Sequence, residues 1–258
     1  MHSYPRWHHK YKLKHDVWVF EPTEETIQIG NEIKNAVQDK WIVPDNYYHL
    51  NLGGHVAALN LHKTDTVFVH LDIKKFFNTI NKSRITRSLK YLFDYPTSRN
   101  YALLSTVKHP DKSPTIFILP YGFVQSPILA SLCLRQSALG IKIENLSKSS
   151  LIRISVYMDD IIISGSDESY ISVLVSELKL AAEKSGFILH KEEGPAQEIT
   201  AFNIRLSNNK TVIIDSRYKE LWDDYNGTTN NNVKHGIATY VSTVNNIQSV
   251  GLDGPLTY

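Results

Sequence analysis

Three aspartates stand at the ends of apolar segments, and their spacing is suited to holding divalent metal ions. Asp159 and Asp160 are adjacent in "SVYMDDIIISG" (residues 155–165), between two runs rich in β-branched residues. Two neighbouring carboxylates repel each other unless a positive charge lies between them. Mg²⁺ suits that place, because it prefers oxygen ligands and is held by one or two carboxylates together with substrate phosphates. This segment alone leaves a solvated acidic turn open as the alternative.

Asp72 supplies a third carboxylate. "TVFVHLDI" (66–73) is an almost continuously apolar run, which predicts a central strand with Asp72 near its end. The segments around residues 152–156 and 161–163 predict a hairpin with Asp159 and Asp160 at its tip. If the first strand lies beside this hairpin, the three carboxylates form a cage for two metal ions about 3.5–4 Å apart, the geometry for in-line phosphoryl displacement.

The elements that position these carboxylates are indicated by periodicity and capping residues. A helix is predicted after Thr23, a candidate N-cap, and another after Asn81 or Ser83. "LPYGFVQSPILASLCL" (119–134) is typical of a loop that enters a helix, with Ser126 as the cap and Pro127 at the first helical position.

A further helix is predicted from Ser166 or Asp167 to Gly186, where glycine suits the C′ position. "FILH" resumes as a strand, and "AFNIRL" and "TVII" are predicted to form a final hairpin. The order of strands and helices favours an α+β fold with a ferredoxin-like sheet whose helices cover one face.

Composition narrows the class of protein. The chain has 258 residues, 42% of them hydrophobic, and a net charge of +2. No apolar stretch approaches the roughly 20 residues that cross a bilayer, and residues 1–16 lack the apolar core of a signal peptide. We therefore expect a cytoplasmic protein without membrane contact. The single cysteine, Cys133, excludes an intramolecular disulfide and a cysteine-cluster zinc site.

The amino-terminal residues mix basic and aromatic side chains. Lysines and histidines between His8 and His15 are interleaved with Trp7 and Tyr11. Such a mixture can neutralise phosphates and stack bases, so this arm is a candidate nucleic-acid contact. A solvated charged tail is the alternative.

Taken together, these segments resemble the palm of a reverse transcriptase. "HLDIKKFFNTI" resembles that family's first aspartate motif, "LPYGFVQSP" its Leu-Pro-X-Gly segment, and "YMDD" its Tyr-X-Asp-Asp motif, in the family's order. "HLNLGGHVAALNLHK" resembles the segment before the first aspartate in bacterial retron and group II intron-like enzymes, and "ITAFNIRL" resembles the primer-grip hairpin. The similarity covers roughly residues 47 to 205.

The resemblance implies a role for each matching residue. Two Mg²⁺ ions, or Mn²⁺, would be held by Asp72, Asp159 and Asp160, with the Ile73 carbonyl assisting. Phe77 matches the steric gate that excludes a 2′-hydroxyl, although packing in the core is the alternative for Phe76 and Phe77, and we expect one of each. The other implied contacts to nucleotide, primer or template are Tyr121, Gly122, Ser126, Lys191, Tyr157, Met158 and Phe202.

The resemblance also implies a right-hand polymerase with a ferredoxin-like palm, reduced fingers and a small thumb. We expect fingers with the basic arm over residues 1–66, a palm over 67–205 with finger-proximal helices around 81–118, and a thumb-like region over 206–258. Tyr121 and Glu193 stand where the family usually has Gln and Lys. Because the usual fingers arginine is absent, Lys12 and Lys14 are the candidates for binding the triphosphate.

The leading hypothesis is a compact bacterial reverse transcriptase of the retron-like or antiviral-defence type, which adds dNTPs to a 3′-hydroxyl. Small fingers and thumb suggest that a structured RNA, a protein partner or self-assembly supplies the missing grip on the template and DNA product. A degenerate polymerase fold that acts as an RNA-binding subunit is the alternative from another class. Template-independent DNA synthesis is a variant, and an RNA-synthesising polymerase is disfavoured by Phe77.

Overall fold

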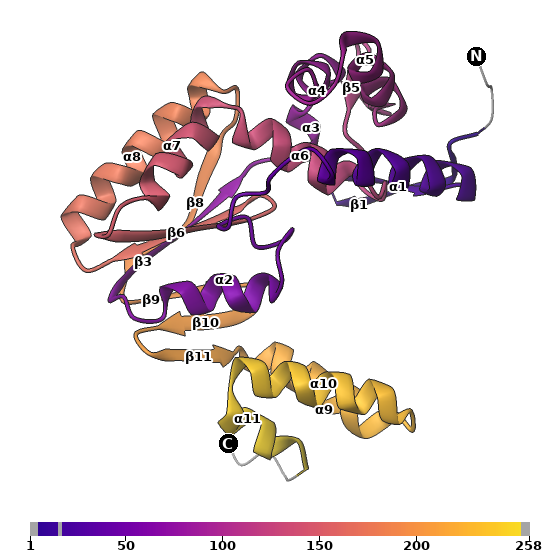
Figure 1. The fold of residues 1–258 in the computed structure, drawn as a ribbon. Helices are drawn as coiled ribbons and strands as arrows, with labels where there is room; N and C mark the ends of the chain where they lie inside the picture. The colour runs from indigo at the N-terminus through magenta and orange to yellow at the C-terminus, as the bar shows by residue number, and fades with distance from the viewer. Residues whose placement is uncertain (1–4, 15–16, 254–258) are drawn as a thin grey trace.

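A computed structural model describes residues 5–14 and 17–253, and Figure 1 shows their fold. At its centre is a four-stranded antiparallel sheet. It is formed by β3 (Val67–Ile73), β6 (Ile152–Tyr157), β7 (Asp160–Gly165) and β8 (Leu189–Ala196), in the spatial order β6-β7-β3-β8. Numbered along the chain, these strands lie in the order second, third, first, fourth, which is the ferredoxin-like arrangement. The predicted α+β class and palm are confirmed.

Three helices cover one face of this palm sheet: α6 (Ser126–Arg135), α7 (Ala138–Ser147) and α8 (Glu168–Lys184). Alternate residues of the two central strands, among them Leu71 and Ile161, enter the large core beneath these helices. Asp167 caps α8 as predicted, and Gly186 follows its end at φ +68°. The opposite face carries Phe68 and Ile162, which pack in a second core. Apolar burial on both faces explains why the first strand is almost continuously hydrophobic.

The second core is completed by α2 (Gly54–His62) and by a three-stranded meander. Its strands are β9 (Glu198–Ala201), β10 (Ile204–Ser207) and β11 (Lys210–Ile213). The prediction that "AFNIRL" is one strand is wrong, because Phe202 and Asn203 adopt φ +57° and +61° and form the turn between β9 and β10. Strand β10 spans the expected boundary between residues 205 and 206.

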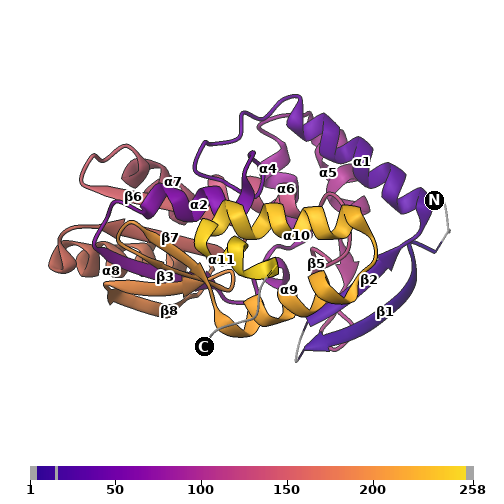
Figure 2. The same ribbon diagram turned by 90° about the horizontal axis from the view of Figure 1, so that it is seen from below.

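The carboxy-terminal residues form the small thumb. It contains α9 (Asp215–Gly227), α10 (Asn231–Val244), α11 (Asn246–Val250) and the 3₁₀-helix η1 (Gly251–Asp253). In Figure 2, seen from below, these helices lie in the foreground, between the palm strands on the left and the β1–β2 hairpin on the right.

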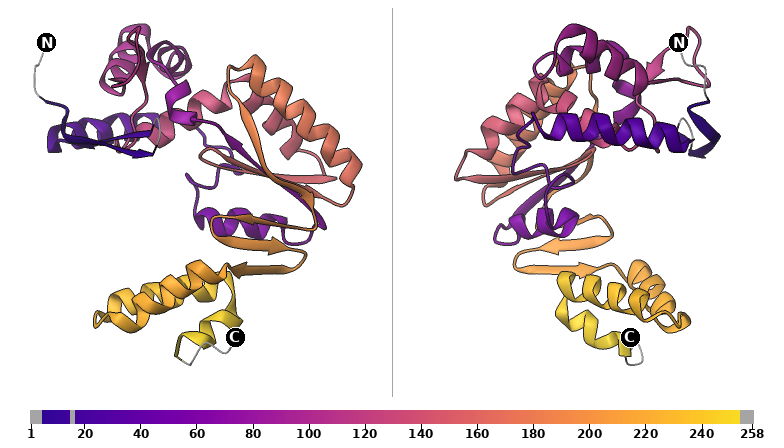
Figure 3. Two further views of the ribbon diagram at one scale, coloured as in Figure 1. Left: turned by 180° about the vertical axis from the view of Figure 1, so that it is seen from behind. Right: turned by 45° about the vertical axis from the view of Figure 1, so that its right-hand side comes forward.

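The fingers begin with a hairpin of β1 (Trp7–Lys14) and β2 (Val17–Pro22), followed by α1 (Glu24–Gln38). The basic arm is thus a strand rather than a tail. Thr23 caps α1 and Asn81 caps α4 as predicted. The remaining elements are α3 (Phe76–Thr79), α4 (Lys82–Leu89), α5 (Tyr95–Leu104), β4 (Val107–Lys108) and β5 (Phe117–Ile118). Figure 3 shows the fingers and thumb at opposite ends of the palm.

Among the described residues, no helix is both long and apolar enough to cross a membrane.

Candidate active site

The strand register brings the first aspartate beside the aspartate pair. Asp72 on β3 lies directly opposite Asp160 on β7, and Tyr157 lies opposite Asp160 on the other side. Met158 and Asp159 therefore form the two-residue turn between β6 and β7. The Ile73 N–H donates to the Asp159 carbonyl oxygen at 2.8 Å, which fixes the turn against the end of β3. The predicted side-by-side placement of strand and hairpin is confirmed.

His49 holds this turn in an unusual conformation. Met158 adopts φ +60°, the left-handed region that non-glycine residues rarely enter. Its N–H donates to His49 Nδ1 at 3.1 Å, and His49 Nε2 lies 2.7 Å from Ser131 Oγ. Burial lowers the pKa of His49 to about 4, so the ring is neutral at neutral pH and carries one proton. Because Nδ1 accepts the Met158 N–H, that proton is on Nε2, which donates to Ser131 Oγ. The aspartate turn is thus tied to α6 through a neutral histidine.

Asp159 lies in the electrostatic environment expected of a metal ligand. Burial raises its pKa to about 6, and the charges of Asp160 and Asp72 add to that rise. A side-chain hydrogen bond to Asp72 contributes in the same direction, so these two carboxyl groups lie together. A divalent cation between them would relieve the repulsion, and two carboxylates fit Mg²⁺, which completes its shell with water and substrate phosphate oxygens.

Asp160 is engaged differently. His70 lies two residues before Asp72 on β3, on the same face, and its Nε2 is 2.6 Å from Asp160 Oδ1. Within residues 5–14 and 17–253, no group of three His, Cys, Asp or Glu side chains is arranged to hold a metal ion. The structure therefore brings Asp72 and Asp159 together and directs one Asp160 oxygen to His70, and the three-carboxylate cage stays a prediction.

Both phenylalanines of the first aspartate motif are buried. Phe76 is 1% exposed and packs against Phe187, while Phe77 is 5% exposed. The ring of Tyr121 covers Phe77, with 4.6 Å between the ring centroids. Burial raises the pKa of Tyr121 to about 12, and the charges of Asp159 and Asp72 contribute, which places Tyr121 beside the carboxylates. A role of Phe77 as steric gate stays a prediction.

Gly122 and Ser126 follow Tyr121 in the same loop. Gly122 adopts φ +103°, and a Cβ built there would lie 2.2 Å from the carbonyl oxygen of Phe20. The backbone that approaches Gly122 is thus strand β2, which also bonds from the Phe20 N–H to the Tyr121 carbonyl at 2.9 Å. The prediction that Ser126 caps α6 is wrong, because Gln125 is the N-cap residue. The buried Ser126 Oγ has no hydrogen-bond partner among the described residues.

Tyr157 and Phe202 line a cavity between the palm and thumb. Their rings are 5.1 Å apart, and the ring of His55 on α2 lies 6.0 Å from Tyr157 and 5.6 Å from Phe202. The cavity has a volume of about 440 Å³ and also contacts Tyr240 on α10, whose hydroxyl is 3.4 Å from His55 Nε2. Two residues expected to contact primer or template thus share one aromatic wall beside the aspartate turn.

The lysines expected to bind the triphosphate are not all described. Lys12 on β1 forms an ion pair with Asp111 at 3.0 Å, and Trp18 Nε1 donates to the same carboxylate oxygen. The side chains of Lys14 and Lys191 lie outside the described residues. The register of β8 places Lys191 opposite Leu71 and His190 opposite Asp72. Glu193 Oε2 accepts the Thr200 N–H at 2.5 Å.

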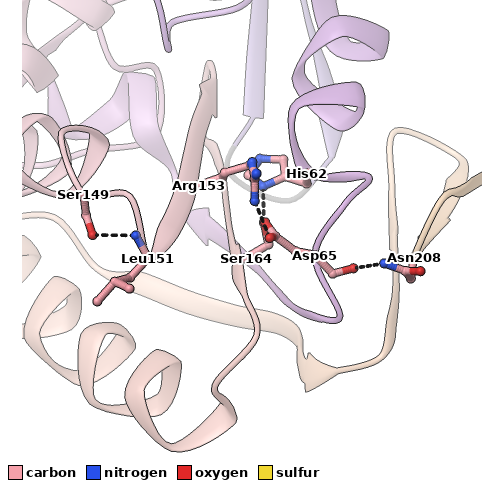
Figure 4. A network of polar contacts seen from close by, with 7 residues as sticks. All are labelled: His62, Asp65, Ser149, Leu151, Arg153, Ser164 and Asn208. Carbon is pink, nitrogen blue, oxygen red and sulfur yellow. Dashed lines mark hydrogen bonds and ion pairs between the residues drawn. The ribbon is translucent and has the colours of Figure 1, made fainter.

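A buried polar network anchors the β6–β7 hairpin on the side away from the aspartate turn (Figure 4). His62 Nδ1 lies 2.6 Å from Ser164 Oγ, and His62 Nε2 lies 2.8 Å from Ser155 Oγ. Because Ser164 Oγ donates to Asp65, it accepts from His62, so the proton is on Nδ1 and Ser155 donates to Nε2. Arg153 pairs with the other Asp65 oxygen. The network links α2 to both β6 and β7, and burial lowers the pKa of His62 to about 3.

Sequence reasoning missed His49, His62 and His70. His70 could have been found, because residues two apart on a strand share a face. His49 and His62 offered no local signal, since their partners are 82 to 109 residues away along the chain.

A search of curated protein sequences finds no match. Among solved structures, one described as "RdRp complex" has a TM-score of 0.51 with 11% identity, covering 75% of this chain and 20% of that one. The telomerase from Candida albicans in complex with a telomeric RNA fragment has a TM-score of 0.48 with 11% identity, covering 89% and 47%.

The foamy viral protease-reverse transcriptase in complex with an RNA/DNA hybrid has a TM-score of 0.46 with 13% identity, covering 77% and 25%. The chain therefore spans less than half the length of each of these relatives. The sequence model of the reverse transcriptase (RNA-dependent DNA polymerase) family matches residues 13–192, well over half of the chain. The chain belongs to the reverse transcriptase family.

Proposed function

We propose that this protein is an Mg²⁺-dependent RNA-directed DNA polymerase that adds deoxynucleotides to a 3′-hydroxyl. The observation that carries the proposal is the pairing of Asp72 with Asp160 across β3 and β7, with Asp159 in the adjoining turn, whose carbonyl oxygen accepts the Ile73 N–H at 2.8 Å. Mg²⁺, when bound there, supplies the positive charge that activates the 3′-hydroxyl and neutralises the phosphates.

The side chains of the protein position the metal-binding carboxylates and form the wall beside them. Asp72, Asp159 and the second oxygen of Asp160 would hold the metal. His70 orients the Asp160 carboxylate and His49 orients the turn. The Tyr121 ring over Phe77 forms a wall beside the carboxylates, where the sugar of an incoming nucleotide would lie. No side-chain nucleophile is required, because the attacking group belongs to the primer.

The proposal also covers the binding partners of the protein and its biological role. The small fingers and thumb support a dedicated structured RNA, a partner protein or a second copy of the chain as an additional grip on the template. The motif resemblance to bacterial retron-like enzymes supports a role in antiviral defence. We include both in the proposal.

A catalytically silent RNA-binding polymerase fold is the second candidate. Two observations favour it: Lys12 is paired with Asp111, and Glu193 stands where a lysine is usual and bonds to a backbone N–H. Against it stands the intact aspartate set, for which a scaffold has no use.

The experiment is nucleotide incorporation by the purified protein with its co-purifying nucleic acid. Each labelled deoxynucleotide or ribonucleotide is supplied with Mg²⁺ to the parent protein, to Asp159→Asn and to Asp45→Asn, a control at an exposed carboxylate. We expect deoxynucleotide incorporation that falls at least 10³-fold in Asp159→Asn and stays unchanged in the control. Incorporation that survives in Asp159→Asn contradicts the metal assignment. If the parent protein and its Asp45→Asn control also incorporate no nucleotide, the result supports the catalytically silent fold.

A further inference from the structure

Positive charge is concentrated in one segment of the fingers. Residues 73–110 contain eight lysines and arginines and a single acidic residue, Asp94, whereas the whole chain has a net charge of only +2. The rest of the chain is therefore net negative. Such a local excess attracts polyanions to one region of a protein whose overall charge is almost neutral.

Four of these cationic side chains surround one hollow between α4 and α5, with a volume of about 450 Å³. The residues that line it are Lys82, Ser83, Thr86, Arg87, Lys90, Tyr95 and Arg99. Among the described residues, no acidic side chain lines the hollow. In the part of the chain that the structure describes, none of the four cations takes part in an ion pair.

Aromatic residues contact three of these four cations, Lys82, Lys90 and Arg99. Lys90 Nζ lies 5.9 Å from the centre of the Tyr95 ring, and Arg99 Nη1 donates to the Tyr95 hydroxyl at 3.2 Å. Lys82 Nζ lies 4.7 Å from the centre of the Phe117 ring. Rings and hydroxyl groups orient a cation without neutralising it, so the charge remains available to a phosphate.

The one acidic residue of the segment is used elsewhere. Asp94 is the N-cap of α5 and accepts the Thr97 N–H at 2.8 Å. That backbone hydrogen bond, a second one from the Thr97 side chain and the charge of Lys40 lower the pKa of Asp94. Its carboxylate is therefore committed to the helix terminus.

The hollow is separate from the candidate active site. In Figure 1 and in both views of Figure 3, α4 and α5 lie on the side of α1 that is away from the thumb helices. The aspartates lie at the end of β3 and in the β6–β7 turn, in the palm. A chain bound in the hollow is thus a different stretch from the one that meets the aspartates.

The exposed tyrosines define the kind of nucleic acid. Tyr95 is 51% exposed at the hollow and Tyr91, at the end of α4, is 76% exposed. An exposed ring beside cations can stack an unpaired base while the cations contact its phosphates. The bases inside a duplex are stacked on one another, so they have no free face on which such a ring could stack.

We propose that the hollow between α4 and α5 is a second nucleic-acid site that binds a single-stranded segment. Its phosphates contact Arg87, Lys90 and Arg99, and one base stacks on Tyr95. This binding requires no catalysis and goes beyond the proposed polymerase activity.

The test measures binding in full-length protein carrying Asp159→Asn, so that its outcome does not depend on polymerisation. The probes are a fluorescent 12-nucleotide RNA, DNA of the same sequence, and an RNA duplex of that length, each titrated at several salt concentrations. A triple variant, Arg87→Gln, Lys90→Gln and Arg99→Gln, should bind the single strands at least tenfold more weakly. The slope of log affinity against log salt should become shallower by about two. The variant removes three phosphate contacts, and each contact to a single strand contributes about 0.7 to the slope.

Tyr95 provides an independent variant. Tyr95→Leu should weaken single-strand binding about tenfold without changing the salt slope, and Tyr95→Trp should retain binding. Thermal unfolding of each variant establishes that it is folded. The charge-matched control is Lys142→Gln, Lys148→Gln and Lys179→Gln at α7 and α8, which should bind within twofold of the parent.

Both outcomes of the comparison between single strands support the proposal. If the RNA binds more tightly than the DNA, the bound segment belongs to the template; if the DNA binds more tightly, it belongs to the product. The proposal is overturned if the triple variant binds as the parent does, if the control loses as much affinity, or if the duplex binds more tightly than the single strands.

Discussion

His70 Nε2 lies 2.6 Å from Asp160 Oδ1, so a histidine two residues before the first aspartate holds the last one. An ionised carboxylate can only accept, and the Nε2–H therefore donates. This contact fixes the orientation of Asp160 while leaving Asp72 and Asp159 together.

We therefore expect His70→Ala to raise the Mg²⁺ concentration that gives half-maximal incorporation by about tenfold, because outer hydrogen-bond partners of metal ligands contribute 10–100-fold to metal affinity. His70→Gln, which retains a donor, should recover part of the loss. The measurement is an Mg²⁺ titration of incorporation at saturating nucleotide. An unchanged Mg²⁺ requirement in His70→Ala would show that the contact does not position the carboxylate.

Phe77 and Tyr121 are in ring contact, with 4.6 Å between the ring centroids and 36° between the ring planes, and the two rings can be tested separately. Phe77 is 5% exposed and Tyr121 covers it, so Phe77→Ala should lower the free energy of unfolding by about 3 kcal/mol through the cavity it leaves. If Phe77 is the steric gate, the ratio of kcat/KM for dNTP to that for rNTP falls in this variant. Tyr121→Phe, which keeps the ring, should leave the ratio unchanged.

The contrasting variant is Tyr121→Ala. If the preference for dNTP over rNTP falls in Tyr121→Ala but not in Phe77→Leu, Tyr121 rather than Phe77 is the steric gate.

Local patterns predicted the palm well, because its signals are short-range. In the palm, the Asp167 cap, the hairpin and the strand with Asp72 near its end follow from periodicity and capping residues. The caps at Thr23 and Asn81 in the fingers follow from the same signals. The turn at Met158 could not be predicted, since its left-handed conformation has no local sequence signal and is held by His49, 109 residues away.

The fingers show the same limit. From the sequence the basic arm is a candidate nucleic-acid contact or a solvated tail, and its pairing as a strand was missed because neither its partner strand nor Asp111 can be inferred from a local pattern. The turn at Phe202 and Asn203 was missed for a different reason: apolar residues on both sides suggest a continuous strand, and two consecutive positive φ angles are uncommon without glycine.

Gly122 is required where strand β2 crosses the loop before α6. Its φ is +103°, and only 2.2 Å would separate an added Cβ from the Phe20 carbonyl oxygen, which leaves no room for a side chain. Gly122→Ala should lower the free energy of unfolding by more than about 2 kcal/mol, because strain and a backbone clash combine.

The matched control is Gly236→Ala in α10, where nothing lies within 4 Å of an added Cβ. That change should raise stability by about 0.5–1 kcal/mol, since alanine favours a helix interior. Urea denaturation of both variants checks the pair, and equal effects at the two glycines would contradict the role of Gly122 at the β2 crossing.

The buried His62 should make stability fall in acid. Burial lowers its pKa from 6.5 to about 3 in the folded protein, and the charge of Arg153 acts in the same direction. The unfolded chain therefore binds a proton below pH 6.5 that the folded chain refuses until about pH 3, so stability is full above pH 6.5 and is lost as the pH falls.

At pH 5 the loss from this residue is about 2 kcal/mol, from 1.36 kcal/mol for each pKa unit. His62→Gln cannot titrate, so although it is less stable at pH 7.5, its free energy of unfolding should fall less between pH 7.5 and pH 5 than that of the parent. Urea denaturation at the two pH values gives the difference. Parallel losses in the two proteins would mean that His62 accepts a proton in the folded network, and that the arrangement of Ser155, Ser164 and Asp65 around it tolerates the charge.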